Sequence, residues 1–135
     1  MFKYVFAAAL MAASVASADV WSFETPSRNI QCWVGVDIGV SDLTCTIIER
    51  HGGPAAPRPA GCASDWGHVF FMNDRGPTYM KCEPLDRSRD AHYQFEYGTS
   101  DDFGGINCHS STKGLECRNR DGHGFFLSRA RQLVF

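Results

Sequence analysis

The 135-residue sequence has no apolar run long enough to form a transmembrane helix. Such a helix needs about 20 successive apolar residues, and the apolar run near the N-terminus, from Tyr4 to Ala13, is clearly shorter. Beyond residue 18 the sequence also lacks the sustained apolar period of an amphipathic helix. We therefore expect neither a membrane span in the mature chain nor a mainly helical fold.

The sequence also has no complete set of catalytic or cofactor-binding motifs. It contains no Gly-x-Ser-x-Gly motif and no glycine-rich phosphate loop. The closest two cysteines, Cys108 and Cys117, are nine positions apart, whereas zinc ligands usually come as Cys-x-x-Cys pairs. Asp101 and Asp102 offer oxygen ligands, but the spaced oxygen pattern of a calcium loop does not surround them. We therefore expect no metal and no other cofactor.

The N-terminus has the three parts of a secretory signal in the right order: Lys3, the apolar run, and the small residues Ala16, Ser17 and Ala18. We expect cleavage after Ala18, with residues 19–135 forming one domain in the periplasm or outside the cell. That mature chain has 12 basic residues against 15 acidic ones, because Lys3 is removed, and so carries a formal charge of −3. This mild acidity argues against nucleic acid or an anionic membrane as the main partner.

Four of the six cysteines form a repeat in which an aliphatic residue stands two positions before the cysteine. The repeat comprises Ile30 and Cys32, Leu43 and Cys45, Ile106 and Cys108, and Leu115 and Cys117. A spacing of two places both side chains on one face of a strand. Cysteines of an exported protein are normally paired, and the repeat favours bonds between sequence neighbours, although six cysteines permit many connectivities. The expected disulfides are Cys32–Cys45, Cys62–Cys82 and Cys108–Cys117.

The rest of the sequence alternates short β-type runs with clusters of turn-forming residues. We expect an all-β fold, a small sandwich or barrel of antiparallel hairpins stapled by about three disulfides. The segment Pro84–Ala91 is a polar loop that has room for one helical turn. The expected strands are Val20–Glu24, Asn29–Val36, Leu43–Ile48, Gly67–Met72, Thr78–Cys82, His92–Tyr97, Gly105–His109, Gly114–Arg118, Gly124–Ser128 and Gln132–Phe135.

Three motifs carry a resemblance to a known family. They are Phe23–Cys32 (FETPSRNIQC), Cys62–Gly67 (CASDWG) and the C-terminal segment from Gly104 to Arg129, which ends in GHGFFLSR. In these the chain resembles a family of small secreted bacterial proteins known only as a domain of unknown function. The resemblance implies export and a compact cysteine-rich fold, and it implies no activity. Arg28 departs from the family pattern, which more often has glycine there; we expect arginine not to tolerate a positive φ.

The residues with the most obvious chemistry are two histidines and two aspartates. His123 lies between two glycines, and His68 follows Asp65 by three positions. If these side chains met, with Asp121 beside them, a hydrolytic or metal-dependent centre would be conceivable. The structural alternative is a histidine that fills a hairpin corner and bonds the backbone, and an aspartate that caps its own turn.

Binding offers a second set of candidates. The last quarter of the chain is basic and could form a patch for an anionic glycan or protein; its basic residues are Lys113, Arg118, Arg120, Arg129 and Arg131. Among these Arg118, Arg120 and Arg129 are the candidate contacts, together with the aromatic Trp66. Alternating exposed charges and a core tryptophan would produce the same pattern. The loops at residues 54–61, 84–91 and 101–105 are the natural places for a binding surface.

Three hypotheses on function follow. The first is an exported, non-enzymatic protein that binds an envelope or extracellular protein or a glycan. The alternative is a small hydrolase or metal-dependent enzyme that uses His68 and His123 with Asp65 or Asp121. A third, a structural envelope component, would show an exposed aromatic patch around Trp21 or Trp33.

Overall fold

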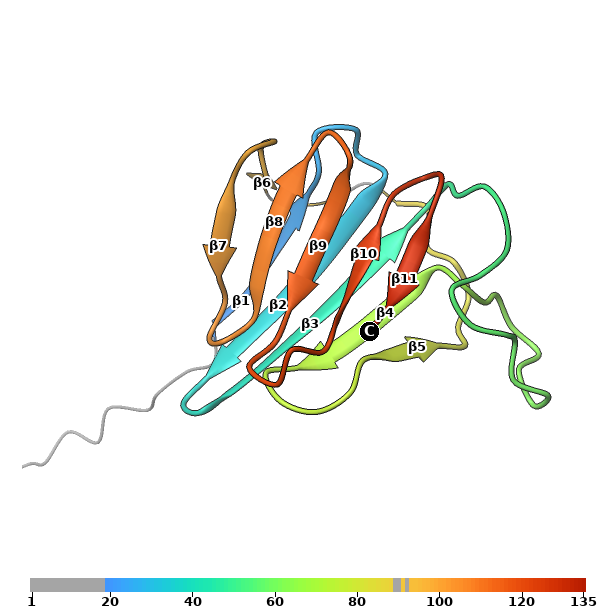
Figure 1. The fold of residues 1–135 in the computed structure, drawn as a ribbon, viewed down its shortest axis with the longest axis horizontal. Helices are drawn as coiled ribbons and strands as arrows, with labels where there is room; N and C mark the ends of the chain where they lie inside the picture. The colour runs from blue at the N-terminus through green and yellow to red at the C-terminus, as the bar shows by residue number, and fades with distance from the viewer. Residues whose placement is uncertain (1–18, 89–90, 92) are drawn as a thin grey trace, which may run out of the picture.

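The computed structural model describes residues 19–88, 91 and 93–135, and it contains eleven strands and no helix over that range (Figure 1). The expected signal segment and the expected strand start at His92 lie outside the described residues. Within the described residues, no helix has the length and apolar character that a membrane span requires. The strands are β1 (Asp19–Glu24), β2 (Ile30–Asp37), β3 (Val40–Ile47), β4 (Val69–Asn73), β5 (Tyr79–Lys81), β6 (Tyr93–Gln94), β7 (Ser100–Asp102), β8 (Asn107–Ser111), β9 (Gly114–Arg118), β10 (Gly124–Leu127) and β11 (Gln132–Val134).

The strands form two sheets that lie face to face (Figure 1). Sheet A has six strands in the order β5-β4-β3-β2-β1-β6, and sheet B has five in the order β11-β10-β9-β8-β7. All neighbours pair antiparallel except β1 and β6, which are parallel. The all-β prediction is confirmed, and the arrangement is a sandwich rather than a single closed barrel.

Alternating apolar residues explain why the two sheets pack on each other. In β2 the buried residues are Ile30, Cys32 and Val34, while Trp33 between them faces outward. Strands β3, β4 and β9 alternate in the same way, and one core cluster joins buried residues of both sheets. A strand whose apolar residues alternate in this way has one apolar face, and it can bury that face only against a second layer.

A disulfide crosses the central hairpin of each sheet. Cys32 pairs directly opposite Cys45 in the β2–β3 register, and Cys108 directly opposite Cys117 in the β8–β9 register. All four sulfurs belong to fully buried residues, and both Cα–Cα distances are 4.1 Å. The third bond, Cys62–Cys82, ties the long loop before β4 to the chain just after β5. The neighbour pairing expected from the repeat is therefore present.

Strand β7 was missed by the sequence analysis. Its three residues, Ser100, Asp101 and Asp102, are all polar and exposed, so they carry no apolar signal. They form a strand because β8 offers an unpaired edge, and Asp101 lies opposite Cys108 there. The expectation of a free loop over residues 101–105 was wrong for its first two residues. The sequence also left room for one helical turn in the loop 84–91, and its described residues 84–88 contain none.

Arg28 adopts a positive φ of 59°, contrary to the expectation for arginine. It lies in the turn between β1 and β2, where its backbone N–H donates to the Thr25 carbonyl over 2.8 Å. The guanidinium Nε lies 3.3 Å from Glu24 Oε1, and the Glu24 side chain is largely buried. Arg28 therefore combines an ion pair to a buried carboxylate with a left-handed backbone conformation. That conformation is unfavourable for any residue that has a side chain.

We predict that each of the two buried disulfides contributes more to stability than the partly exposed Cys62–Cys82 bond does. Removing Cys108 and Cys117 together as Cys→Ala should lower the free energy of unfolding by about 3 kcal/mol from loop entropy, with a further loss from the cavity left in the core. Removing Cys62 and Cys82 should cost less, although its sequence separation of 20 exceeds the 9 of the buried pair. Urea-induced unfolding measures the free energy of unfolding of both double variants. A larger loss for the Cys62 and Cys82 variant would show that loop length decides the contribution of each disulfide.

We predict that Arg28→Gly is more stable than Arg28→Ala by about 1 kcal/mol. Both variants lose the contact with Glu24, so the difference between them reports only the backbone cost of the positive φ. Chemical denaturation of the two variants under the same conditions gives the comparison. Equal stability would indicate that the left-handed conformation is not strained in this turn.

Candidate ligand-binding pocket

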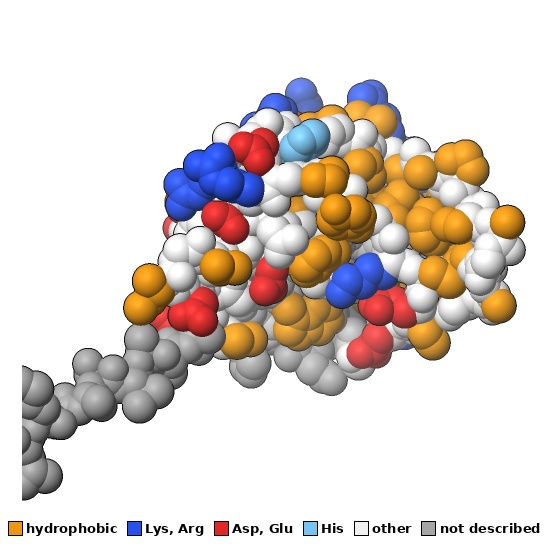
Figure 2. Space-filling view, turned by 90° about the horizontal axis from the view of Figure 1, so that it is seen from below, with side chains coloured by type: hydrophobic (Ala, Val, Ile, Leu, Met, Phe, Trp, Pro, Cys, Tyr) orange, Lys and Arg blue, Asp and Glu red, His pale blue; other side chains and the backbone are white. Residues whose placement is uncertain are grey.

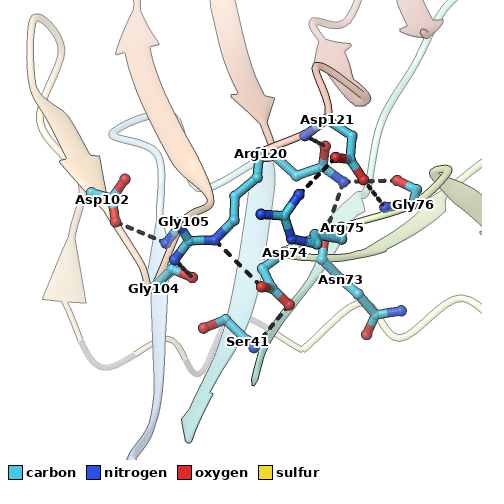
Figure 3. Close-up of polar contacts among 11 residues, drawn as sticks. Ser41, Asn73, Asp74, Arg75, Gly76, Asp102, Gly104, Gly105, Arg120 and Asp121 are labelled. Carbon is cyan, nitrogen blue, oxygen red and sulfur yellow. Dashed lines mark hydrogen bonds and ion pairs between the residues drawn. The ribbon is translucent and has the colours of Figure 1, made fainter. Parts of the chain in front are cut away.

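One end of the sandwich is closed by polar side chains that join turns of both sheets (Figure 3). Arg120, in the β9–β10 turn, places its Nε 3.4 Å from Asp74 Oδ2 in the β4–β5 turn and donates to the Gly104 carbonyl over 3.3 Å. Asp74 Oδ1 accepts from the Ser41 backbone N–H over 3.3 Å. Arg120 therefore links sheet B to sheet A, and is used inside the fold rather than left free for a ligand.

Asn119 and Asp121 extend the same connection. The buried Asn119 amide donates to the carbonyls of Asn73 and Gly76, over 3.0 and 2.8 Å. Asp121 accepts from Arg75 over 3.0 Å and from the Gly76 backbone N–H over 2.8 Å. We call this group the polar clasp; it consists of Ser41, Asp74, Arg75, Asn119, Arg120 and Asp121. Seen from this end, charged side chains of both signs lie side by side over one half of the surface, with hydrophobic ones beyond them (Figure 2).

The clasp lowers the pKa of Asp121 from its ordinary value of 3.8. The largest cause is the hydrogen bond from the Gly76 backbone N–H, and the positive charge of Arg75 adds to it. A hydrogen bond to the ionised form favours that form. Asp121 is thus held as a carboxylate by structural partners, which is the opposite of what a general acid requires.

Backbone geometry explains why glycine stands on either side of His123. Gly122 has a φ of 81°, and a Cβ on Gly124 would overlap the Cys117 carbonyl oxygen. The backbone N–H of His123 donates to Asn119 Oδ1 over 3.1 Å, and its carbonyl accepts from the Asn119 N–H. The sharpest local motif of the sequence is therefore a tight hairpin turn.

His68 and Asp65 make different contacts elsewhere. The His68 Nδ1 lies 2.8 Å from the Ile47 carbonyl, just before β4 begins. Asp65 accepts from the Leu85 backbone N–H over 2.7 Å, rather than capping its own turn. Asp121 contacts the turn that follows β4, so His68 and Asp121 lie at opposite ends of a five-residue strand, roughly 15 Å apart. In the described residues no group of three His, Cys, Asp or Glu side chains could hold a metal.

The other candidate binding residues are mostly engaged within the fold. Trp66 is buried and donates from Nε1 to the Ala56 carbonyl over 2.8 Å, which anchors the long loop before β4. Arg118 lies over the Phe135 ring at 4.6 Å and 3.7 Å from Glu116. Arg129 differs, because it also lines a cavity.

Exposed aromatic residues lie on the outer face of sheet A. Trp33, Phe71 and Tyr79 belong to one cross-strand row, with Thr44 between the first two. Trp33 and Tyr79 are 38% and 52% exposed. Trp21 is not part of this row, since it packs against the core and donates to the Tyr93 hydroxyl over 3.2 Å.

A pocket of about 330 Å³ lies at the end of the sandwich opposite the clasp. Three turns surround it, one from sheet A and two from sheet B: the β1–β2 turn, the β8–β9 turn and the β10–β11 turn, which meet at the top of Figure 1. Tyr97, beyond β6, completes the wall. We call this cavity the end pocket. Its volume is at the lower end of the range for small-molecule sites.

The end pocket combines an apolar base with polar walls. Ile30 and Leu127, one from each sheet, are buried apolar lining residues. The remaining lining residues are mostly polar; those with hydroxyl groups are Thr25, Ser27, Tyr97, Ser111, Thr112 and Ser128. An apolar cavity with a few convergent polar groups is the usual composition of a ligand site.

Hydrogen bonds hold the walls of the end pocket. The Asn29 amide donates to the Glu49 carbonyl over 2.9 Å and accepts from the Glu49 N–H over 2.8 Å. The Gly98 N–H donates to the Ser110 carbonyl over 2.7 Å, next to Tyr97. The His51 N–H donates to the Arg129 carbonyl over 2.7 Å. The pocket is therefore preformed and needs little ordering on binding.

Sequence reasoning placed two residues of the end pocket, Lys113 and Arg129, in the basic last quarter of the chain, and missed the others. The hydroxyl residues stand in turns, where serine and threonine are expected whether or not they bind a ligand. Only the packing of one sheet on the other brings residues near 25, 111 and 128 to a common cavity. No motif along the chain indicates that these residues share a cavity.

The fold and pocket define a class: small two-sheet β-sandwich domains with three disulfides and a preformed pocket at one end. Residues 4–135 match the family described as "Family of unknown function (DUF6636)", and the chain belongs to that family. Comparisons with curated proteins and with solved structures gave no significant match.

We predict that the Asp121 carboxyl titrates below 3.8, and that it still does so in Arg75→Ala. The reason is that the Gly76 N–H, which the variant retains, is the main cause of the shift. Since the folded pKa is the lower one, the stabilisation is complete above the unfolded value and is lost as the pH falls through the folded value. Carboxyl NMR titration measures the pKa; an Asp121 value at or above 3.8 in the wild type would contradict the clasp.

Proposed function

We propose that the protein is an exported, non-enzymatic binding protein whose ligand occupies the end pocket. The observation that carries this proposal is the convergence of three turns, from both sheets, around a cavity with an apolar base and polar walls. At the opposite end the polar clasp is filled with internal bonds. A second hollow of about 340 Å³ lies beside it at the β2–β3 hairpin, but only one sheet lines it, and its two charged residues, Asp37 and Asp42, are both acidic.

Export is supported by two independent features. One is the signal-like N-terminus with Lys3, an apolar run and small residues at positions 16–18. The other is that all six cysteines are in disulfides, which persist in oxidising compartments. We propose the periplasm or the extracellular space as the location.

The enzyme hypothesis draws no support from the geometry. A hydrolytic centre needs a base within hydrogen-bond reach of its partner. His68 lies against the Ile47 carbonyl, Asp65 accepts from the Leu85 backbone N–H, and Asp121 accepts from Arg75 and the Gly76 backbone N–H. The charge of His123 acts on Asp121, but that carboxylate is already bonded to the clasp. The mild negative charge leaves nucleic acid an unfavourable partner. A small molecule or the end of a glycan fits a pocket of this size better than a broad protein surface does.

We predict that a panel of monosaccharides, sugar acids and amino acids screened by amide NMR will shift residues 25–30, 97, 111–114 and 127–130. Ala130→Trp, which places a large ring at an exposed lining position, should reduce the affinity of any such probe at least ~10-fold. Ala60→Trp is the matched control, because Ala60 is also an exposed alanine and lies in a loop outside the pocket. Shifts confined to the clasp, or equal effects of both variants, would overturn the proposal.

A further inference from the structure

The charges around the end pocket favour an anion. Its lining contains two cationic side chains, Lys113 and Arg129, and no aspartate or glutamate. This is unusual for a chain in which acidic residues outnumber basic ones by 15 to 13. A concave site lined by one sign of charge attracts ligands of the opposite sign.

The two cations differ in their availability. Arg129 donates from Nη1 to Glu49 Oε2 over 2.9 Å, so its charge is partly balanced. Lys113 makes no ion pair within the described part of the chain. Its backbone N–H donates to Ser111 Oγ over 3.2 Å, which orders the β8–β9 turn that carries it. Lys113 is therefore the cation with a free ammonium group at the pocket.

The uncharged part of the lining matches a sugar ring. A hydroxyl both donates and accepts, so Thr25, Ser27, Thr112 and Ser128 suit a ligand with several hydroxyls of its own. The apolar base and the 45% exposed ring of Tyr97 offer surfaces for the C–H face of such a ring. Thr25 and Ser27 bond each other and Ser128 bonds the Arg131 backbone, but a hydroxyl oxygen that makes such bonds can still accept from a sugar hydroxyl. The chain of a simple fatty acid has no donor for them, and a metal cation would meet no carboxylate.

We propose that the end pocket binds a sugar acid, and that Lys113 is the counter-ion of its carboxylate. This rests on the proposed function, since it names the ligand class of the same pocket. The carboxylate pairs with the Lys113 ammonium group, while hydroxyls of the sugar bond those of the walls. The acid is bound either as a free monosaccharide or as the terminal unit of an acidic glycan, because the pocket opens at the end of the molecule.

The test compares galacturonate with galactose, which share the ring and differ in the carboxylate. Isothermal titration calorimetry on the oxidised mature protein should show galacturonate binding about tenfold more tightly, in keeping with one charge-assisted contact. The preference should weaken as salt is added. Trigalacturonate, added as a third probe, distinguishes the two sources: tighter binding than the monomer indicates a glycan end, and equal binding a free acid.

Lys113→Gln removes the charge and retains most of the side-chain length. It should bring the affinity for galacturonate down to the affinity that the same variant has for galactose. Lys81→Gln is the matched control, because Lys81 lies over the Phe71 ring on sheet A, outside the pocket. Dispersed amide spectra of both variants establish that they are folded.

The failures are distinguishable. Equal affinity for the acid and the neutral sugar, an acid preference that survives Lys113→Gln, or no binding of either sugar would each overturn the sugar-acid proposal. The end pocket itself would then be judged by the Ala130→Trp comparison across the wider panel. If a neutral probe binds the wild type and loses its binding in Ala130→Trp, the end pocket remains the binding site and only the sugar acid is rejected as its ligand.

Discussion

The structure depends on one covalent constraint that occurs twice. A disulfide joins directly opposed residues in the central hairpin of each sheet, Cys32 with Cys45 and Cys108 with Cys117. Because side chains alternate along a strand, a one-residue slip would turn the whole apolar face outward, and each bond prevents that slip. The two sheets can therefore present matched apolar faces, and the turns at both ends of the sandwich take fixed positions.

The two ends of the sandwich use their polar groups in opposite ways. At the clasp, Arg120, Asp121 and Asn119 bond turns of the other sheet, and buried or half-buried polar groups find partners inside the protein. At the end pocket Thr25, Ser27 and Ser128 also bond within the walls, but the ammonium group of the lining residue Lys113 has no ion pair in the described part of the chain. Polar groups that are satisfied internally stabilise a fold, whereas groups left open in a concave site are available to a ligand. This contrast is the physical basis for assigning binding to one end.

Strands with alternating apolar residues were predictable, and elements defined by their neighbours were not. Ile30, Cys32 and Val34 predicted β2 by their period, and the repeat around the cysteines predicted the disulfide partners. Strand β7 has three exposed polar residues and exists because β8 has a free edge, so no local pattern could reveal it. Arg28 was judged by its own conformational preference, and the turn imposed a positive φ regardless. His123 attracted attention by its glycines, which serve the hairpin instead.

The sequence by itself determined the all-β class, most strands and the pairing of cysteines, because these follow from side-chain period and from residues near one another in the chain. It also predicted export, through a segment at residues 1–18 that lies outside the described part. Only the tertiary structure decided that His68 and Asp121 lie at opposite ends of β4, and that residues near 25, 111 and 128 share a cavity. Such positions depend on how one sheet packs over the other, and local preferences of the chain carry no information about that.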